Sequence, residues 1–148
     1  MSGSIGSRFP KQYRKDFCNR HLVPGSVFRL FAPETTPPKI KRFILLAFDE
    51  KAESAAILFI NTEILRNPYI KALQYPIKAS EKPFISHDSF IDCSHLYERD
   101  LAPLRRAFID DLGIYLGALS TQDLKAMSTL VQNAKTISPR LKRKYGLL

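Results

Sequence analysis

The stretch IKRFILLAFDEKAESAAILFINTEI, residues 40–64, decides the fold. Its first part, 40–49, is a continuous apolar run bounded by charges, which is typical of a strand buried on both faces. The charged connection 49–54 has the length of a hairpin loop, so residues 55–64 are predicted to return as an antiparallel strand. VFRLFA, residues 27–32, is rich in Val and Phe and predicts a strand before them, which completes a three-stranded meander.

Weaker patterns follow the meander. A helical turn after Asn67-Pro68 is one interpretation of an ambiguous segment, and the edge strand predicted after it has to tolerate Pro76. Residues 97–111 leave two alternatives open, a helix interrupted by Pro103 or a strand followed by a loop and a helix. Short strands are predicted over residues 75–80, 84–94 and 112–119.

The clearest helix begins at Ser120, whose hydroxyl is an N-cap with an acid, Asp123, three residues later. Apolar residues then recur at helical spacing from Leu124 to Val131, and the helix is predicted to run to about Lys135. The fold class is therefore mainly β, of the β+α type. We expect a small antiparallel sheet that curls into a barrel and is closed by this amphipathic C-terminal helix.

The charge of +9 is concentrated at the two ends of the chain. Residues 1–23 hold five Lys/Arg and one acid, whereas residues 124–148 hold six Lys/Arg and no acid. We therefore divide the 148 residues into a basic, weakly ordered N-terminal arm (1–23), one barrel domain (24–136) and a basic C-terminal tail (137–148). Such ends commonly bind phosphate backbones or an acidic protein, and solubilising tails are the alternative.

Two cysteines, Cys18 and Cys93, do not make a disulfide framework, and reduced thiols are expected. The longest apolar runs span six residues, which is too short to cross a bilayer, and the first residues lack the apolar segment of a signal peptide. We expect a cytoplasmic protein without membrane association.

The segment FISHDSFIDCSH, residues 84–95, is the richest in reactive side chains. His87, Cys93 and His95 share one face of a regular strand, but His87 and Cys93 are then about 20 Å apart at roughly 3.3 Å per residue. No metal site is therefore expected, and Cys93 fits a small buried thiol better than a nucleophile. Because no glycine-rich phosphate loop is present either, no cofactor is expected.

One arrangement suits phosphodiester chemistry. Lys39, Lys41 and Arg42 lie where one long strand begins, and Asn61 and Thr62 lie where the next one ends. In an antiparallel pair with a short connection these two ends are neighbours. An arginine can stabilise charge on a pentacoordinate phosphate, and a fixed hydroxyl can orient it. The alternative is that the cations only guard an aggregation-prone strand.

The order of these elements resembles the MazF/PemK family of toxin-type proteins. The start of the last helix, from Gly117 through Ser120 to Asp123, is the nearest match to the family pattern. The chain departs from that pattern at Ser26, where an acidic residue is usual, and at Phe43, where a proline follows the arginine. The matching segments are PGSVFRLF (24–31), KRFILLAF (41–48), AAILFINTE (55–63), DSFIDCSHLY (88–97) and LGALSTQDLKAM (116–127).

The resemblance implies an SH3-like barrel, usually a homodimer, that cleaves single-stranded RNA without metal by attack of the RNA 2′-hydroxyl. It also implies an acidic antitoxin partner that covers the RNA groove. Carried over by position, the catalytic residues are Arg42, which stabilises the phosphorane, and Thr62, which positions the scissile phosphate. The alternative is a non-catalytic barrel of the same fold that binds nucleic acid or protein. The expected substrate-binding residues are Lys39, Lys41, Asn61, His87, Asp88 and Ser89.

Overall fold

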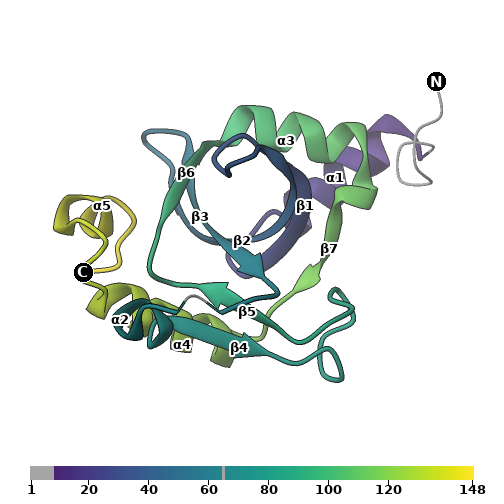
Figure 1. The fold of residues 1–148 in the computed structure, drawn as a ribbon. Helices are drawn as coiled ribbons and strands as arrows, with labels where there is room; N and C mark the ends of the chain where they lie inside the picture. The colour runs from purple at the N-terminus through teal and green to yellow at the C-terminus, as the bar shows by residue number, and fades with distance from the viewer. Residues whose placement is uncertain (1–8, 65) are drawn as a thin grey trace.

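The computed structural model describes residues 9–64 and 66–148 as a curled antiparallel sheet flanked by helices (Figure 1). The strands lie in the order β4-β5-β3-β2-β1-β7, and β6 pairs with another part of β3. The strands are β1 (Ser26–Ala32), β2 (Lys39–Asp49), β3 (Ser54–Asn61), β4 (Gln74–Ile77), β5 (Ser89–Asp92), β6 (Tyr97–Asp100) and β7 (Tyr115–Ala118). The helices are α1 (Lys11–His21), α2 (Pro68–Lys71), α3 (Leu101–Asp110), α4 (Thr121–Asn133) and α5 (Pro139–Lys144), with a 3-10 turn at Leu112–Ile114.

The predicted meander is confirmed, and β1, β2 and β3 form the centre of the sheet. Phe28 pairs with Phe43, and Phe43 pairs in turn with Phe59, so one aromatic residue from each strand lies in the same row. Because side chains alternate across a strand, this row faces one side of the sheet and its neighbours face the other. Both faces are buried along the middle of β2 and β3, as the continuous apolar runs predicted.

Two apolar layers therefore enclose the sheet. In Figure 1 α1 and α3 lie on one side of it and α4 on the other. The first layer joins α3 to the face of the sheet that carries the aromatic row. The ring of Phe108 on α3 packs edge-on against Phe28, with 5.3 Å between the ring centroids. The second layer joins α4 to the opposite face of the sheet through Met127 and Val131, which pack with Val27, Ile44 and Leu58.

Helix α4 confirms the predicted capped helix. The Ser120 hydroxyl accepts a hydrogen bond from the backbone N–H of Asp123 at 3.0 Å. The Asp123 carboxylate accepts hydrogen bonds from the Tyr75 hydroxyl at 2.5 Å and the Lys82 ammonium at 2.6 Å. These contacts fix the start of α4 against β4 and the loop that follows it.

The described part of the N-terminal segment is not weakly ordered, which corrects that expectation. Residues 11–21 form helix α1, Cys18 is buried, and the Phe17 ring packs against Phe108 and Tyr115. A few apolar residues at helical spacing are enough to anchor a helix whose other positions are charged. Residues 1–8 of the predicted arm lie outside the described residues.

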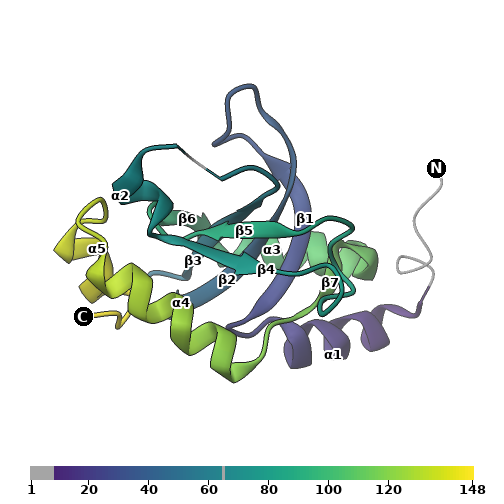
Figure 2. The same ribbon diagram turned by 60° about the horizontal axis from the view of Figure 1, so that its bottom comes forward.

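The C-terminal segment also packs against the barrel. Residues 139–144 form α5, and Tyr145 and Leu147 are buried in the same layer as α4. The Tyr145 hydroxyl is hydrogen-bonded to Ser54 at 2.8 Å. Figures 1 and 2 place α1 and α5 on opposite sides of the molecule, so these two basic helices do not form one surface. Among the described residues, no helix has the length and apolarity needed to cross a membrane.

Two predicted strands are shorter than expected, and the alternative left open for residues 97–111 is decided. In the predicted strand 112–119, Leu112–Ile114 form a 3-10 turn and only Tyr115–Ala118 form β7. Only Ser89–Asp92 of the predicted strand 84–94 is regular, because Phe84 and Ile85 turn into the core before β5 begins. Residues 97–111 adopt a strand followed directly by helix α3. Pro103 lies in the first turn of α3, where a backbone N–H has no partner within the helix, so the proline does not interrupt it.

Candidate functional site

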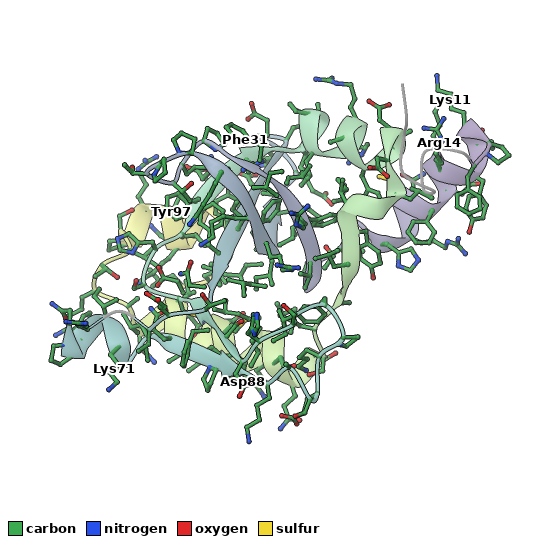
Figure 3. The ribbon with its side chains drawn as sticks, turned by 45° about the vertical axis from the view of Figure 1, so that its right-hand side comes forward. Lys11, Arg14, Phe31, Lys71, Asp88 and Tyr97 are labelled. Atoms are coloured by element: carbon green, nitrogen blue, oxygen red, sulfur yellow. The ribbon has the colours of Figure 1, made fainter. Side chains whose placement is uncertain are left out.

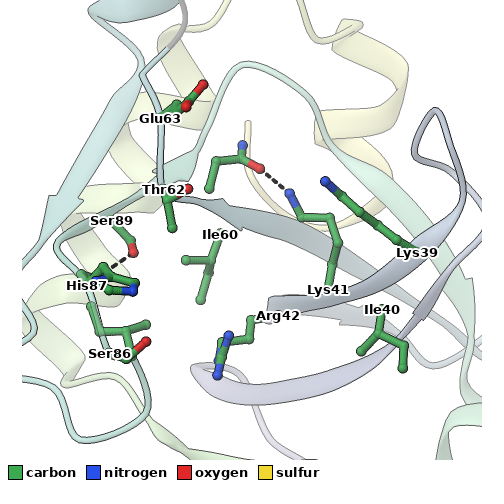
Figure 4. A pocket seen from close by; sticks show the side chains of 12 residues that line it. Lys39, Ile40, Lys41, Arg42, Ile60, Thr62, Glu63, Ser86, His87 and Ser89 are labelled. Carbon is green, nitrogen blue, oxygen red and sulfur yellow. Dashed lines mark hydrogen bonds between the residues drawn. The ribbon is translucent and has the colours of Figure 1, made fainter.

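A pocket of about 630 Å³ opens where β2 begins and β3 ends (Figure 4). The pairing of β5 with β3, Ile60 to Ile91 and Asn61 to Phe90, brings the segment before β5 to this edge as the opposite wall. The pocket is lined by Lys39, Ile40, Lys41, Arg42, Ile60, Asn61, Thr62, Glu63, Ile85, Ser86, His87 and Ser89.

The β2–β3 register explains why residues about twenty positions apart meet here. Phe43 pairs with Phe59 next to the pocket. Two residues further along each strand, the Lys41 ammonium donates a hydrogen bond to the Asn61 side-chain oxygen. Arg42 lies between Lys41 and Phe43 on β2. Its side chain points to the opposite face of the strand from theirs, toward the wall that carries Ser86 and His87 (Figure 4).

Seven of the eight residues predicted for the site line this one pocket; Asp88 is the exception. Its carboxylate accepts a hydrogen bond from the backbone N–H of Ala79 at 2.9 Å and fixes the loop behind the pocket wall. Ser89 lines the pocket, but its hydroxyl donates to the carbonyl of His87 at 2.7 Å and its side chain is buried. We therefore attribute a structural contribution to Asp88 and Ser89.

Five lining residues were not predicted. Ile60 precedes the predicted Asn61 on β3. Ile40 and Glu63 directly neighbour predicted residues, and their positions follow from the β2–β3 register. Ile85 and Ser86 lie in a segment that was interpreted as strand, so nothing in the sequence indicated that they would form a wall.

Arg42 is the most unusual group in the pocket. Its Nε atom is buried, and no described residue accepts a hydrogen bond from it. A buried donor without a partner costs free energy, and such groups are rare in folded proteins unless a ligand or water completes them. A guanidinium offers donors in a planar fork that matches the oxygens of a phosphate. The geometry of Arg42 is therefore suited to an anion held in the pocket.

The pocket carries an excess of positive charge. Lys39, Lys41 and Arg42 provide three cations, and Glu63 provides one carboxylate. Burial lowers the pKa of Lys41, the neighbouring charge of Lys39 lowers it further, and Asp92 acts in the opposite direction. The Lys41 ammonium also lies 5.6 Å from the centre of the Phe59 ring. An anion in the pocket would relieve the repulsion between the two lysines.

Replacing Lys39 with alanine should raise the pKa of Lys41 toward its ordinary value, because one neighbouring positive charge disappears. The measurement is a pH titration of the Lys41 side chain by NMR. Lys51→Ala, in the exposed turn between β2 and β3, is the control and should leave that titration unchanged. An unchanged Lys41 titration in Lys39→Ala would show that the two lysines do not interact.

The reactive segment 84–95 does not converge on one centre. Cys93 is buried, and burial raises the pKa of its thiol to about 12, which keeps it protonated and unreactive. His87 lines the pocket, whereas the ring of His95 is hydrogen-bonded to the Ser94 hydroxyl at 2.9 Å outside it. No group of three or more His, Cys, Asp or Glu side chains in the described parts of the chain is arranged to hold a metal ion.

Comparisons with known proteins support the fold. No protein-family model matches the sequence, and no curated protein matches it. Among solved structures, the Mycobacterium tuberculosis toxin MazF-mt6 is similar, with a TM-score of 0.51 and 15% sequence identity. The match covers 76% of this chain and 98% of the toxin chain. The similarity shows that this chain has a MazF-like fold.

Proposed function

We propose that this protein is a MazF/PemK-like toxin, an endoribonuclease that cleaves single-stranded RNA without a metal ion. The observation that carries the proposal is the pocket at the β2–β3 edge, where Arg42 presents an unpartnered buried donor beside Lys39, Lys41, Thr62 and His87. The MazF-like fold and the name of its structural neighbour, a toxin, support the same function.

The pocket has to stabilise the charge that develops on the phosphate, position the phosphate, and allow two proton transfers. The RNA 2′-hydroxyl attacks the adjacent phosphorus, the bond from phosphorus to the 5′-oxygen breaks, and a 2′,3′-cyclic phosphate and a 5′-hydroxyl form. Arg42 stabilises the charge on the phosphorane oxygens, and the Thr62 hydroxyl positions the phosphate. The proton of the 2′-hydroxyl leaves and one proton reaches the 5′-oxygen. Among the lining side chains His87 supplies the imidazole, and we assign to it the acceptance of the proton from the 2′-hydroxyl; solvent water supplies the proton to the 5′-oxygen, which leaves on the opposite side of the phosphorus.

The partners follow from the same proposal. Single-stranded RNA is the substrate, with Lys39, Lys41 and Asn61 holding its backbone, and no cofactor takes part. An acidic antitoxin would neutralise the protein by occupying the cationic pocket, and the active form would be a cytoplasmic homodimer. The division into segments 1–23, 24–136 and 137–148 stays a prediction.

Incubation of the purified protein with a synthetic single-stranded RNA, with and without EDTA, tests the proposal. We expect cleavage in both samples, because the donors that stabilise the phosphorane are side chains of the protein. Loss of cleavage in EDTA would contradict the metal-free mechanism. Salt-dependent RNA binding without any cleavage products would identify the protein as a non-catalytic barrel of the same fold.

A further inference from the structure

The β1–β2 ribbon continues beyond the pocket, and in Figure 2 its connecting loop projects from the body of the molecule. In this part of the ribbon Arg29 of β1 is the direct cross-strand partner of Arg42. Directly opposite side chains on one face of an antiparallel pair have Cβ atoms about 4.5–5.5 Å apart, and like charges at that spacing are destabilising. Neither guanidinium makes a hydrogen bond or an ion pair with any described residue. An anion between them would remove the repulsion.

The next pair on the same face is apolar. Phe31 lies two residues after Arg29 on β1, and its cross-strand partner is Ile40. The two side chains are 56% and 53% exposed, which is unusual for apolar residues this large. Figure 3 shows Phe31 at the edge of the sheet, away from the helices at either end of the chain. Ile40 also lines the pocket and Phe31 does not, so the apolar pair begins at the rim of the pocket and extends away from it.

We propose that these four residues form a nucleotide-binding subsite at the mouth of the pocket, which we call the ribbon subsite: beside Arg42 on the scissile phosphate, Arg29 holds the next phosphate of the strand, and Phe31 and Ile40 receive the adjoining base. The inference rests on the proposed function, because it names how the same RNA strand leaves the pocket. Two cations followed by two apolar side chains match the order of phosphate and base along a single strand. An aromatic face accepts any base by stacking, so the subsite would add affinity with little sequence preference.

Nothing in the sequence distinguishes Arg29, because it lies within a predicted strand among apolar residues. Its importance appears only from the register, which places it opposite Arg42 rather than opposite an acidic residue. Unlike Arg42, Arg29 does not line the pocket, so it should contribute to RNA binding and not to bond cleavage.

The test is binding of a fluorescent single strand with 2′-deoxy sugars, which lacks the nucleophile and stays intact, measured over a range of salt concentrations. Arg29→Ala should weaken binding on the order of tenfold at low salt. It should also reduce the steepness of the plot of log affinity against log salt by about 0.7, the contribution of one phosphate contact. Arg106→Ala, an exposed arginine on α3, is the matched control and should change both quantities less.

Phe31 gives a second, independent measurement. Phe31→Ala should weaken binding on the order of tenfold without changing the salt dependence, and Phe31→Tyr should restore binding because it keeps the ring. Arg29 and Phe31 are both exposed, so the variants at these two positions should fold, and thermal unfolding checks this. If Arg29→Ala and Phe31→Ala bind like Arg106→Ala while the wild type still cleaves RNA, the ribbon subsite is wrong and the proposed function stands.

The remaining outcomes separate the two proposals. Binding that depends on Arg29 and Phe31, together with no cleavage of RNA, supports the ribbon subsite and contradicts the ribonuclease. Failure of the wild type to bind the strand overturns the subsite, and the cleavage assay then decides the proposed function by itself. If binding of a polyglutamate peptide depends on Arg29 and Phe31 and binding of the strand does not, the surface docks an acidic protein and the proposal is wrong.

Discussion

Arg42→Ala should lower the rate of RNA cleavage by roughly a hundredfold or more, the usual cost of removing one donor that stabilises an oxyanion. The wild-type guanidinium lines the pocket, and its Nε has no partner in the described protein, so all its hydrogen-bonding capacity is available to the phosphorane. For the same reason, the substitution breaks no internal hydrogen bond. We expect the free energy of unfolding to change by less than about 1 kcal/mol.

Single-turnover cleavage and urea unfolding of the same preparations measure the two effects. Arg42→Lys keeps the charge but loses the planar fork, so its rate should lie between those of the wild type and Arg42→Ala. Arg106→Ala, on α3, controls for the loss of one positive charge. Wild-type cleavage by a folded Arg42→Ala protein would remove Arg42 from the mechanism.

Removal of residues 139–148 should lower the free energy of unfolding by about 3–6 kcal/mol, because it deletes two buried side chains, Tyr145 and Leu147. It also deletes Lys142, whose ammonium donates hydrogen bonds to the carbonyls of Gln132 and Ala134 at 2.9 and 2.7 Å. These carbonyls belong to the end of α4, where the helix itself supplies no donors. A loss of this size is comparable with the whole stability of many domains.

Chemical denaturation of the truncated and full-length proteins measures the effect. Removal of Leu148 alone is the control, because that side chain is 70% exposed and should contribute little. Equal stability of the protein without residues 139–148 would mean that the segment is a tail and that its packing in the structure is not significant for folding.

The central strands and the last helix could be predicted because each is specified by local pattern. Continuous apolar runs on either side of a hairpin fix β2 and β3, and Ser120 marks the start of α4. The same hairpin fixes which side chains meet at its open edge, so Arg42 and Thr62 could be placed in one pocket from spacing alone. The roles of these residues in catalysis stay a prediction.

The opposite wall of the pocket could be predicted only in part: the resemblance pointed to His87 and Ser89, whereas Ile85 and Ser86 depend on contacts distant in sequence. Ile85 and Ser86 reach the pocket only because β5 pairs with the end of β3, and a run of alternating residues does not reveal its partner strand. The chain ends were misjudged for a related reason. The many charges of the N-terminal segment indicated weak order, whereas buried residues such as Cys18 anchor it to the core, and Tyr145 and Leu147 likewise anchor the basic C-terminal segment.

End-group analysis of one synthetic RNA tests the central claim most directly. The wild-type protein and Arg42→Ala are each incubated in EDTA with an all-ribose single strand and with the same strand carrying 2′-deoxy sugars. We predict that only the wild type cleaves at a substantial rate, that only the ribose strand is cut, and that the products end in 2′,3′-cyclic phosphate and 5′-hydroxyl. Cleavage of the deoxy strand, products ending in 3′-hydroxyl and 5′-phosphate, or no cleavage by the wild type would contradict the account.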